Sequence, residues 1–315
     1  MKFLPFISLI SAAQAHGVYS TLFIDGTRLA DGKCLRTSFT LDNATSPITN
    51  LDSPELACGI AGQTPAPDTC DIKAGAKLSF EFRLWASGTP AGTIDPSHLG
   101  PMAIYAKRVQ DSTEDPTGPG WFKLWDYGYD GTMWATQKLI ANDGIVSVVI
   151  PESLESGIYF VRPEIIALHN LAAGPAQFYT SCAQISVQGG SKDFKIEKET
   201  ERVSIPGYVK ASDPAVNFNS HPDAVKQFPY ILAGPKSFGD GTNEVAFGPL
   251  DAPVVPILPS TSTSISVVTP TPTPTSTSSI AYPSATGTVL PGHRRPGNGT
   301  CRRRRRRGAA GAKLQ

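Results

Sequence analysis

The residue at position 16 could bind a metal in an unusual way. His16 and Gly17 follow Ala13-Gln14-Ala15, a small-x-small pattern that signal peptidases accept. Cleavage after Ala15 would leave one residue carrying both a free α-amine and an imidazole. These two nitrogens can chelate one metal ion, because the amine gives up its proton once a metal competes for the lone pair. The alternative is that His follows the cleavage site by accident, so further ligands are needed downstream.

Downstream polar residues offer such ligands, although each one alone has an ordinary explanation. His98 lies in a Gly- and Pro-rich loop, where a histidine is commonly a surface side chain. His169 is followed by Gln177 and Tyr179, which are two apart and point to the same face of a strand. Such a pair can equally face solvent. His221 matches no motif, and we expect an exposed loop residue there.

The elements that must position these residues are predicted to be β-strands. Apolar side chains at 78, 80, 82 and 84 alternate with polar ones, as in a half-buried strand. Further segments rich in Val, Ile and aromatic residues predict strands at 19–24, 103–109, 145–150, 158–162 and 183–187. No helical periodicity is sustained between them. The sequence therefore predicts an all-β sandwich of two sheets, immunoglobulin/fibronectin-III-like, with long loops.

The N-terminus predicts secretion. Residues 1–15 contain one charge, an apolar stretch and the small-x-small end of a signal peptide, although a buried first strand is the alternative. Cysteines of a secreted chain are expected to form disulfides. Asn43 and Asn298 lie in Asn-x-Thr glycosylation sequons, which are short and weak patterns.

Charge and composition exclude several classes. Nine of the 28 Lys and Arg residues lie beyond position 292, where there is no acid, so the rest of the chain carries 19 basic and 27 acidic side chains. An acidic body does not predict a nucleic-acid-binding domain. No apolar run reaches the roughly 18 residues of a membrane span. With 17% charged residues and many Gly and Pro, a coiled coil is excluded.

Beyond residue 250 the chain changes character. From 259 to 279, 18 of 21 residues are Ser, Thr or Pro, which predicts an extended linker. We therefore divide the chain into a signal peptide (1–15), a folded body (16–250), a linker (251–292) and a basic tail (293–315). The arginines of the tail could hold an anionic surface, mark a processing site or reflect a coding-sequence error; a solvated disordered tail is favoured.

Taken together, the motifs resemble the fungal lytic polysaccharide monooxygenases of auxiliary-activity family nine, formerly glycoside hydrolase family sixty-one. Their order carries the resemblance: His16-Gly17, then Ser97–Pro101 (Ser-His-x-Gly-Pro), Arg162–His169 (Arg-Pro-Glu-Ile-Ile-Ala-Leu-His) and Gln177-x-Tyr179. The resemblance covers essentially the whole body. Further matching segments are Ala57–Gly59, Ile72–Gly75, Trp121–Trp125, Lys138–Asn142 and Ser212–Ala215.

The resemblance implies one copper ion (Cu²⁺/Cu⁺) in a histidine brace. His16 would supply its amine and an imidazole nitrogen, His98 a third nitrogen, and Tyr179 the axial position. His169 and Gln177 would hydrogen-bond O2 or peroxide and steer its protonation, with Tyr179 counted among the catalytic residues. The resemblance also suggests that Glu164 orients Gln177. Nitrogen donors with open coordination positions suit copper.

The activity implied by the resemblance is oxidative cleavage of β-1,4-glucan at C1, C4 or both, with O2 or H2O2. An external electron donor, either a small-molecule reductant or a secreted dehydrogenase, would reduce the copper. The partner is cellulose or a related β-glucan surface, met by a flat copper-bearing face of a monomer. Tyr19, Phe218 and Tyr230 are candidates for stacking on sugar rings.

The family pattern also suggests two disulfides. Cys58 would pair with Cys182, and Cys34–Cys70 is then the remaining pair in the body. Two features depart from common family members: no carbohydrate-binding module follows the linker, and the basic tail contains an odd Cys301.

Two other functions compete. A non-enzymatic secreted copper-binding protein could use the same brace, but it would not need Gln177 and Tyr179. A glycoside hydrolase is disfavoured, because the acidic pair Glu114/Asp115 lies in a polar loop typical of solvated surface and no Gly-x-Ser-x-Gly motif is present.

Overall fold

The computed structural model describes residues 16–41, 43–84, 92–169, 174–191, 201–220, 229–238 and 246–250. The chain divides into two units, Met1–Leu258 and Pro259–Gln315, and every described residue belongs to the first. The expected signal peptide, linker and basic tail lie outside the described residues, as do His221, Asn298 and Cys301.

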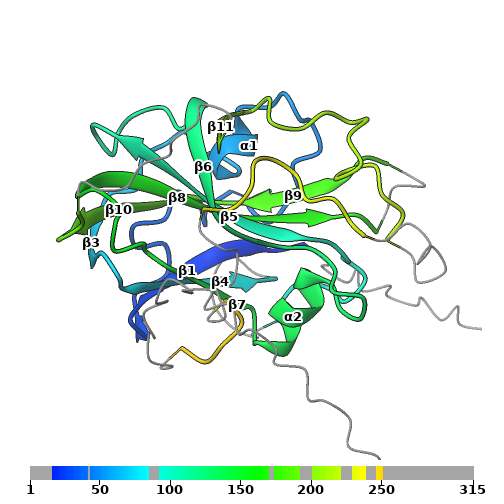
Figure 1. The fold of residues 1–315 in the computed structure, drawn as a ribbon, viewed down its shortest axis with the longest axis horizontal. Coiled ribbons are helices and arrows are strands. Elements are labelled where there is room, and N and C mark those ends of the chain that lie inside the picture. Colours follow the sequence, from blue (N-terminus) through cyan, green and yellow to red (C-terminus); the bar gives the residue numbers. More distant parts are fainter. Residues whose placement is uncertain are drawn as a thin grey trace, which may run out of the picture. The chain divides into compact units, whose positions relative to one another are not determined.

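Two β-sheets form the described fold, so the predicted sandwich is confirmed (Figure 1). The smaller sheet contains, in order, β2 (Thr27–Arg28), β1 (Val18–Ile24), β4 (Lys77–Arg83) and β7 (Ile145–Val149). The larger sheet contains β11 (Arg202–Ile205), β6 (Gly118–Tyr127), β5 (Met102–Val109), β8 (Gly157–Ala167), β10 (Ala183–Gln188) and β3 (Cys70–Lys73). A short strand, β9 (Gln177–Thr180), pairs with β8.

The core between the sheets follows from the alternation of side chains along each strand. On β4, Leu78, Phe80 and Phe82 are fully buried and pack in one hydrophobic cluster with residues of the larger sheet such as Val161 and Ile165. The opposite face of the larger sheet is also covered. Phe160 on β8 packs there in a second cluster, which includes Leu56, Ala57 and Cys58 of α1 (Glu55–Cys58). Both faces of β8 are therefore buried.

Some elements of the fold have no clear signal in the sequence. No strand was expected where β6 begins, because Gly118 and Gly120 resemble a turn in sequence; both adopt positive φ, +85° and +103°. The helix α2 (Ala135–Ala141) has seven residues, too few to sustain a recognisable period. Neither α1 nor α2 approaches the length required to cross a bilayer.

Both expected disulfides are present in the described fold. Cys34 and Cys70 are bonded, with 5.8 Å between their Cα atoms, and Cys58 and Cys182 are bonded at 4.9 Å. The second bond joins the end of α1 to the connection between β9 and β10, across 124 residues of sequence. The pairing implied by the family resemblance is confirmed.

Candidate metal centre

Three residues that are distant in sequence meet at one end of the sandwich. His16 precedes β1, His98 lies in the loop before β5, and Tyr179 lies on β9. Their ring centroids are 6.1 Å apart for the two histidines, 6.3 Å for His16 and Tyr179, and 5.9 Å for His98 and Tyr179. The three rings are therefore arranged around a common space.

One nitrogen of the buried His98 imidazole has no hydrogen-bond partner among the described residues. This nitrogen is Nε2, whereas Nδ1 lies 3.3 Å from the Ser97 hydroxyl. Burial, and then the neighbouring His169 imidazole, lower the pKa of His98 to about 4. The ring is therefore neutral at neutral pH. Since buried polar atoms are nearly always satisfied, an unpartnered neutral imidazole nitrogen fits a metal ligand.

His169 and Gln177 flank these three rings. The His169 ring lies 4.0 Å from the His98 ring, centroid to centroid, and burial lowers the His169 pKa. Gln177 Oε1 accepts a hydrogen bond of 2.9 Å from the Tyr179 hydroxyl. Burial raises the Tyr179 pKa well above its ordinary value, so the phenol keeps its proton. The structure thus brings together all five residues predicted for the centre, with uncharged His98, His169, Gln177 and Tyr179.

Backbone contacts explain the motif around His98. Asp95 Oδ1 accepts the Ser97 N–H at 2.9 Å, and the Asp95 carbonyl accepts the His98 N–H at 2.9 Å, which closes a tight turn. A Cβ atom on Gly100 would lie 1.8 Å from the Ile166 carbonyl oxygen. Only glycine allows the loop to lie this close to β8, and His98 is held there as a result.

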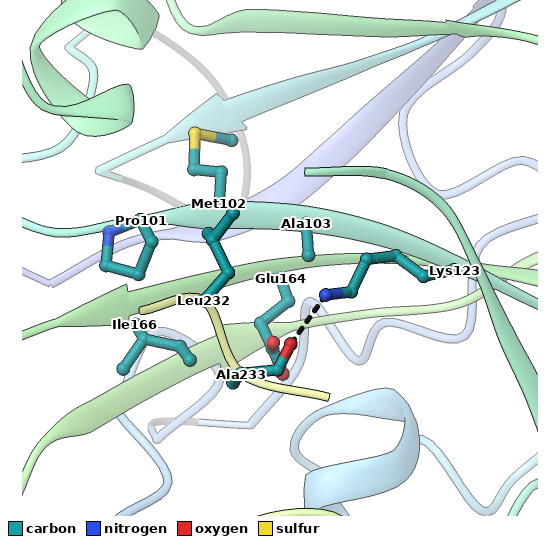
Figure 2. Close-up of a pocket in the computed structure, with 8 residues that line it drawn as sticks. All are labelled: Pro101, Met102, Ala103, Lys123, Glu164, Ile166, Leu232 and Ala233. Carbon is teal, nitrogen blue, oxygen red and sulfur yellow. Dashed lines mark hydrogen bonds between the residues drawn. The ribbon is translucent and has the colours of Figure 1, made fainter. Parts of the chain in front are cut away.

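The expectation that Glu164 orients Gln177 is wrong. In the pairing of β8 with β9, Gln177 lies opposite Ala167, which is three residues from Glu164 and therefore on the other face of the strand. The Glu164 carboxylate instead forms a 2.6 Å ion pair with Arg162 and accepts a hydrogen bond from Tyr208. It also lines a cavity of about 10 Å³ beside Lys123 and Ala233 (Figure 2).

Two of the three aromatic residues proposed to stack on sugars are buried. Tyr19 is fully buried between the sheets and packs its ring against Phe82, with centroids 5.0 Å apart. Phe218 is 6% exposed and packs edge-on against Trp134. Substrate contact through Tyr19 or Phe218 is therefore wrong, because neither presents a face to solvent. Tyr230 is partly exposed, and its role stays a prediction.

Comparison with known proteins places the fold and this cluster in one family. Residues 16–228 match the model of Auxiliary Activity family 9 (formerly GH61). "AA9 family lytic polysaccharide monooxygenase H" of Botryotinia fuckeliana is 42% identical over 240 residues, which cover 74% of this chain and 53% of that protein. The chain thus spans about half the length of that relative.

Solved structures agree. The structure named "CvAA9A" superposes with a TM-score of 0.63 and 33% identity, over 71% of this chain and 98% of that one. A structure described as a cellulose-active polysaccharide monooxygenase from M. thermophila has a TM-score of 0.54 and 25% identity, over 71% and 99%. A family match that covers both sheets and every residue of the cluster shows that this chain belongs to Auxiliary Activity family 9.

Proposed function

We propose that this chain is a secreted, copper-dependent lytic polysaccharide monooxygenase that cleaves β-1,4-glucan chains of cellulose at C1, C4 or both. The observation that carries the proposal is the cluster of neutral nitrogen and oxygen donors, with the buried Nε2 of His98 unpartnered among the described residues. Membership of the family and the names of its similar members support the activity. The M. thermophila structure is that of a cellulose-active enzyme, which supports cellulose as the substrate.

One copper ion fits the donors present. His16 would offer its imidazole and, after cleavage behind Ala15, its α-amine. His98 would offer Nε2, and Tyr179 its hydroxyl oxygen. Imidazole and amine nitrogens are donors that suit Cu(II), and among first-row divalent metals Cu(II) generally binds such sites most tightly. When bound, the ion supplies one-electron chemistry between Cu(II) and Cu(I) toward O2 or H2O2. A neutral phenol and a neutral His98 require no proton loss before they bind.

The reaction inserts one oxygen atom into a C–H bond beside the glycosidic oxygen. With H2O2, the C–H becomes C–OH and one water leaves; with O2, an external donor must also supply two electrons and two protons. The hydroxylated carbon then expels its neighbour, which breaks the chain.

Gln177 and His169 would hold the oxygen reactant and direct protons. Because Gln177 Oε1 already accepts the Tyr179 hydroxyl, its amide nitrogen is the end that remains to donate to O2 or peroxide. His169 is neutral at neutral pH, and its buried Nδ1 lacks a partner within the described part of the chain. Each side chain can therefore donate or accept a hydrogen bond without a net charge.

The cellular setting follows from the same proposal. The mature chain would begin at His16, be exported, carry a glycan on the exposed Asn43, and act as a monomer on the surface of cellulose or a related β-glucan. Substrate contact would come from a flat face around the copper, because a crystalline chain cannot enter a pocket. A small-molecule reductant or a secreted dehydrogenase would supply the electrons, and the body would be tethered to the basic tail by the 251–292 linker.

The decisive experiment uses the secreted protein, loaded with copper and incubated with amorphous cellulose, ascorbate and either O2 or H2O2. Mass spectrometry of the soluble products should detect aldonic acids or 4-ketoaldoses, which would also reveal the site of oxidation. The His16→Ala variant should yield neither. Native oligosaccharides alone would indicate a hydrolase, and no products from any β-glucan despite stoichiometric copper would favour the copper-binding alternative.

Two further variants test the individual roles. Gln177→Ala should keep copper bound and cut more slowly, and wild-type cleavage by this variant would contradict its role. A form with one extra residue ahead of His16 should lose tight copper binding, because the amine becomes an amide. Full activity of that form would contradict the brace.

A further inference from the structure

The backbone directly after His16 lies close to the aromatic ring of Phe82. A Cβ atom on Gly17 would stand 2.4 Å from Cε1 of Phe82 and 2.5 Å from the carbonyl oxygen of Arg83. Contacts this short are not seen for real Cβ atoms, so only glycine allows this approach. The Phe82 ring therefore sets how deeply the N-terminal residue can lie against β4.

The same ring also contacts Tyr179. The Phe82 and Tyr179 centroids are 5.8 Å apart, with an interplanar angle of 88°, which is an edge-to-face contact. Phe82 thus contacts both the backbone directly after His16 and the phenol ring of Tyr179. His98 is held separately, by the contacts of its loop with the end of β8.

Phe82 is itself held rigidly from behind. Its side chain is fully buried, and the Tyr19 ring packs against it at 5.0 Å and 79°. Its N–H donates to the Gly144 carbonyl at 2.8 Å. Gly144 adopts φ +81°, and a Cβ there would lie 2.5 Å from the Phe82 carbonyl oxygen. A ring confined on these sides has little room to turn in a close-packed core.

We propose that Phe82 is a positioning residue for the copper centre: its ring sets the separation between His16 and Tyr179 and thereby the geometry in which copper is held. The inference rests on the proposed function, because it concerns the same centre. Loss of a hydrogen-bond partner behind a metal ligand commonly lowers metal affinity by about 10–100-fold, and Phe82 acts through packing alone. We expect the Phe82→Leu variant to bind copper about ten-fold more weakly, at the lower end of this range, since leucine keeps most of the apolar volume but not the flat ring.

A matched control lies two residues earlier on the same strand. Phe80 is also fully buried in the inter-sheet core and packs edge-on against Tyr19 at 6.1 Å. Within the described part of the chain, its close ring contact is with Tyr19 and not with either proposed ligand. Phe80→Leu should therefore lower the melting temperature about as much as Phe82→Leu, while leaving the centre unchanged.

The test measures the copper dissociation constant by calorimetry and the Cu(II) electron paramagnetic resonance spectrum of the correctly processed protein. The Phe82→Leu variant should bind copper about ten-fold more weakly and show a shifted spectrum, whereas Phe80→Leu should match wild type in both. A wild-type spectrum and affinity for folded Phe82→Leu would overturn the inference. Equal changes in both variants would also overturn it, because the effect would then be general loosening of the core.

A second variant keeps the inference testable if Phe82→Leu does not fold. Gly17→Ala leaves the ring in place and displaces the backbone from it, so copper affinity should again fall and the spectrum shift; no change would overturn the inference. Failure of the proposed function is distinguishable on the wild-type protein. Without a copper centre, wild type would bind no copper tightly; as a non-enzymatic copper-binding protein, wild type would bind copper but release no oxidised products from any β-glucan.

Discussion

The buried ion pair behind the centre offers a sharp test of how this fold is held together. Arg162 and Glu164 on β8 are 0% and 1% exposed, and their charged atoms lie 2.6 Å apart. The Arg162 guanidinium also donates to the carbonyl oxygens of Leu56 and Ala57 in α1. Arg162→Met keeps much of the apolar stem but removes the charge and these donors. Glu164 would then be a buried charge without its cation.

The magnitude follows from burial. Removing one partner of a buried ion pair costs about 3–5 kcal/mol, because the remaining charge is desolvated and uncompensated. For domains of this size class, about 2–4 °C of melting temperature is lost per kcal/mol, so the Arg162→Met variant should melt about 6–20 °C lower. The double variant Arg162→Met/Glu164→Leu should recover part of that loss, since neither charge then remains buried.

Thermal and urea unfolding of the single and double variants provide the assay, with a surface pair as control. The charged atoms of Arg108 and Glu155 lie 3.0 Å apart, and their side chains are 51% and 41% exposed. Arg108→Met should therefore cost no more than about 1 kcal/mol. The reasoning is refuted if Arg162→Met costs no more than Arg108→Met, or if the double variant is less stable than Arg162→Met alone.

Three further outcomes are expected. Gly100→Ala should weaken copper binding and lower the melting temperature, because the new Cβ would stand 1.8 Å from a carbonyl oxygen of β8 and displace the loop that carries His98; an unchanged copper affinity by calorimetry would contradict this. Replacing both Cys58 and Cys182 by Ser should lower the free energy of unfolding by about 2–5 kcal/mol, since the bond closes a loop across 124 residues; a loss under about 1 kcal/mol in urea would count against it. Asp31→Asn tests a pH dependence. Desolvation raises the pKa of Asp31, but hydrogen bonds and neighbouring arginines outweigh it, so the pKa is lowered. Its stabilising contribution is present above about pH 4 and is lost as the pH falls. The variant should therefore cost at most about 1 kcal/mol at about pH 6 and less at about pH 2.5, and an equal cost at both pH values would refute the assignment.

Local patterns predicted most of the strands that form the sandwich. The alternation at 78–84 identified β4, because a half-buried strand has one apolar and one polar face. The sequence did not predict β6 and α2, because neither has a clear periodic pattern. Glycines at the start of β6 resemble a turn, and a helix of seven residues is too short to show a period.

Motifs predicted the candidate centre because its chemistry depends on residue type. Few side chains can offer neutral nitrogen, and His16 and His98 were visible as soon as the expected processing site was recognised. Gly17 and Gly100 were present in the same motifs, yet nothing in the sequence says what a Cβ atom would strike. The answers, Phe82 in one case and the Ile166 carbonyl in the other, come from distant strands.

The sequence by itself determined which residues could bind a metal, which cysteines could pair and which segments alternate as strands. Only the tertiary structure decided which face each side chain meets. Both faces of β8 are buried, so no polar face marks the side on which Glu164 lies, and it faces away from Gln177. The sequence predicted wrongly that Tyr19 and Phe218 contact sugar. An aromatic side chain is equally suited to a core or to a sugar-binding surface, and only packing determines which one it joins.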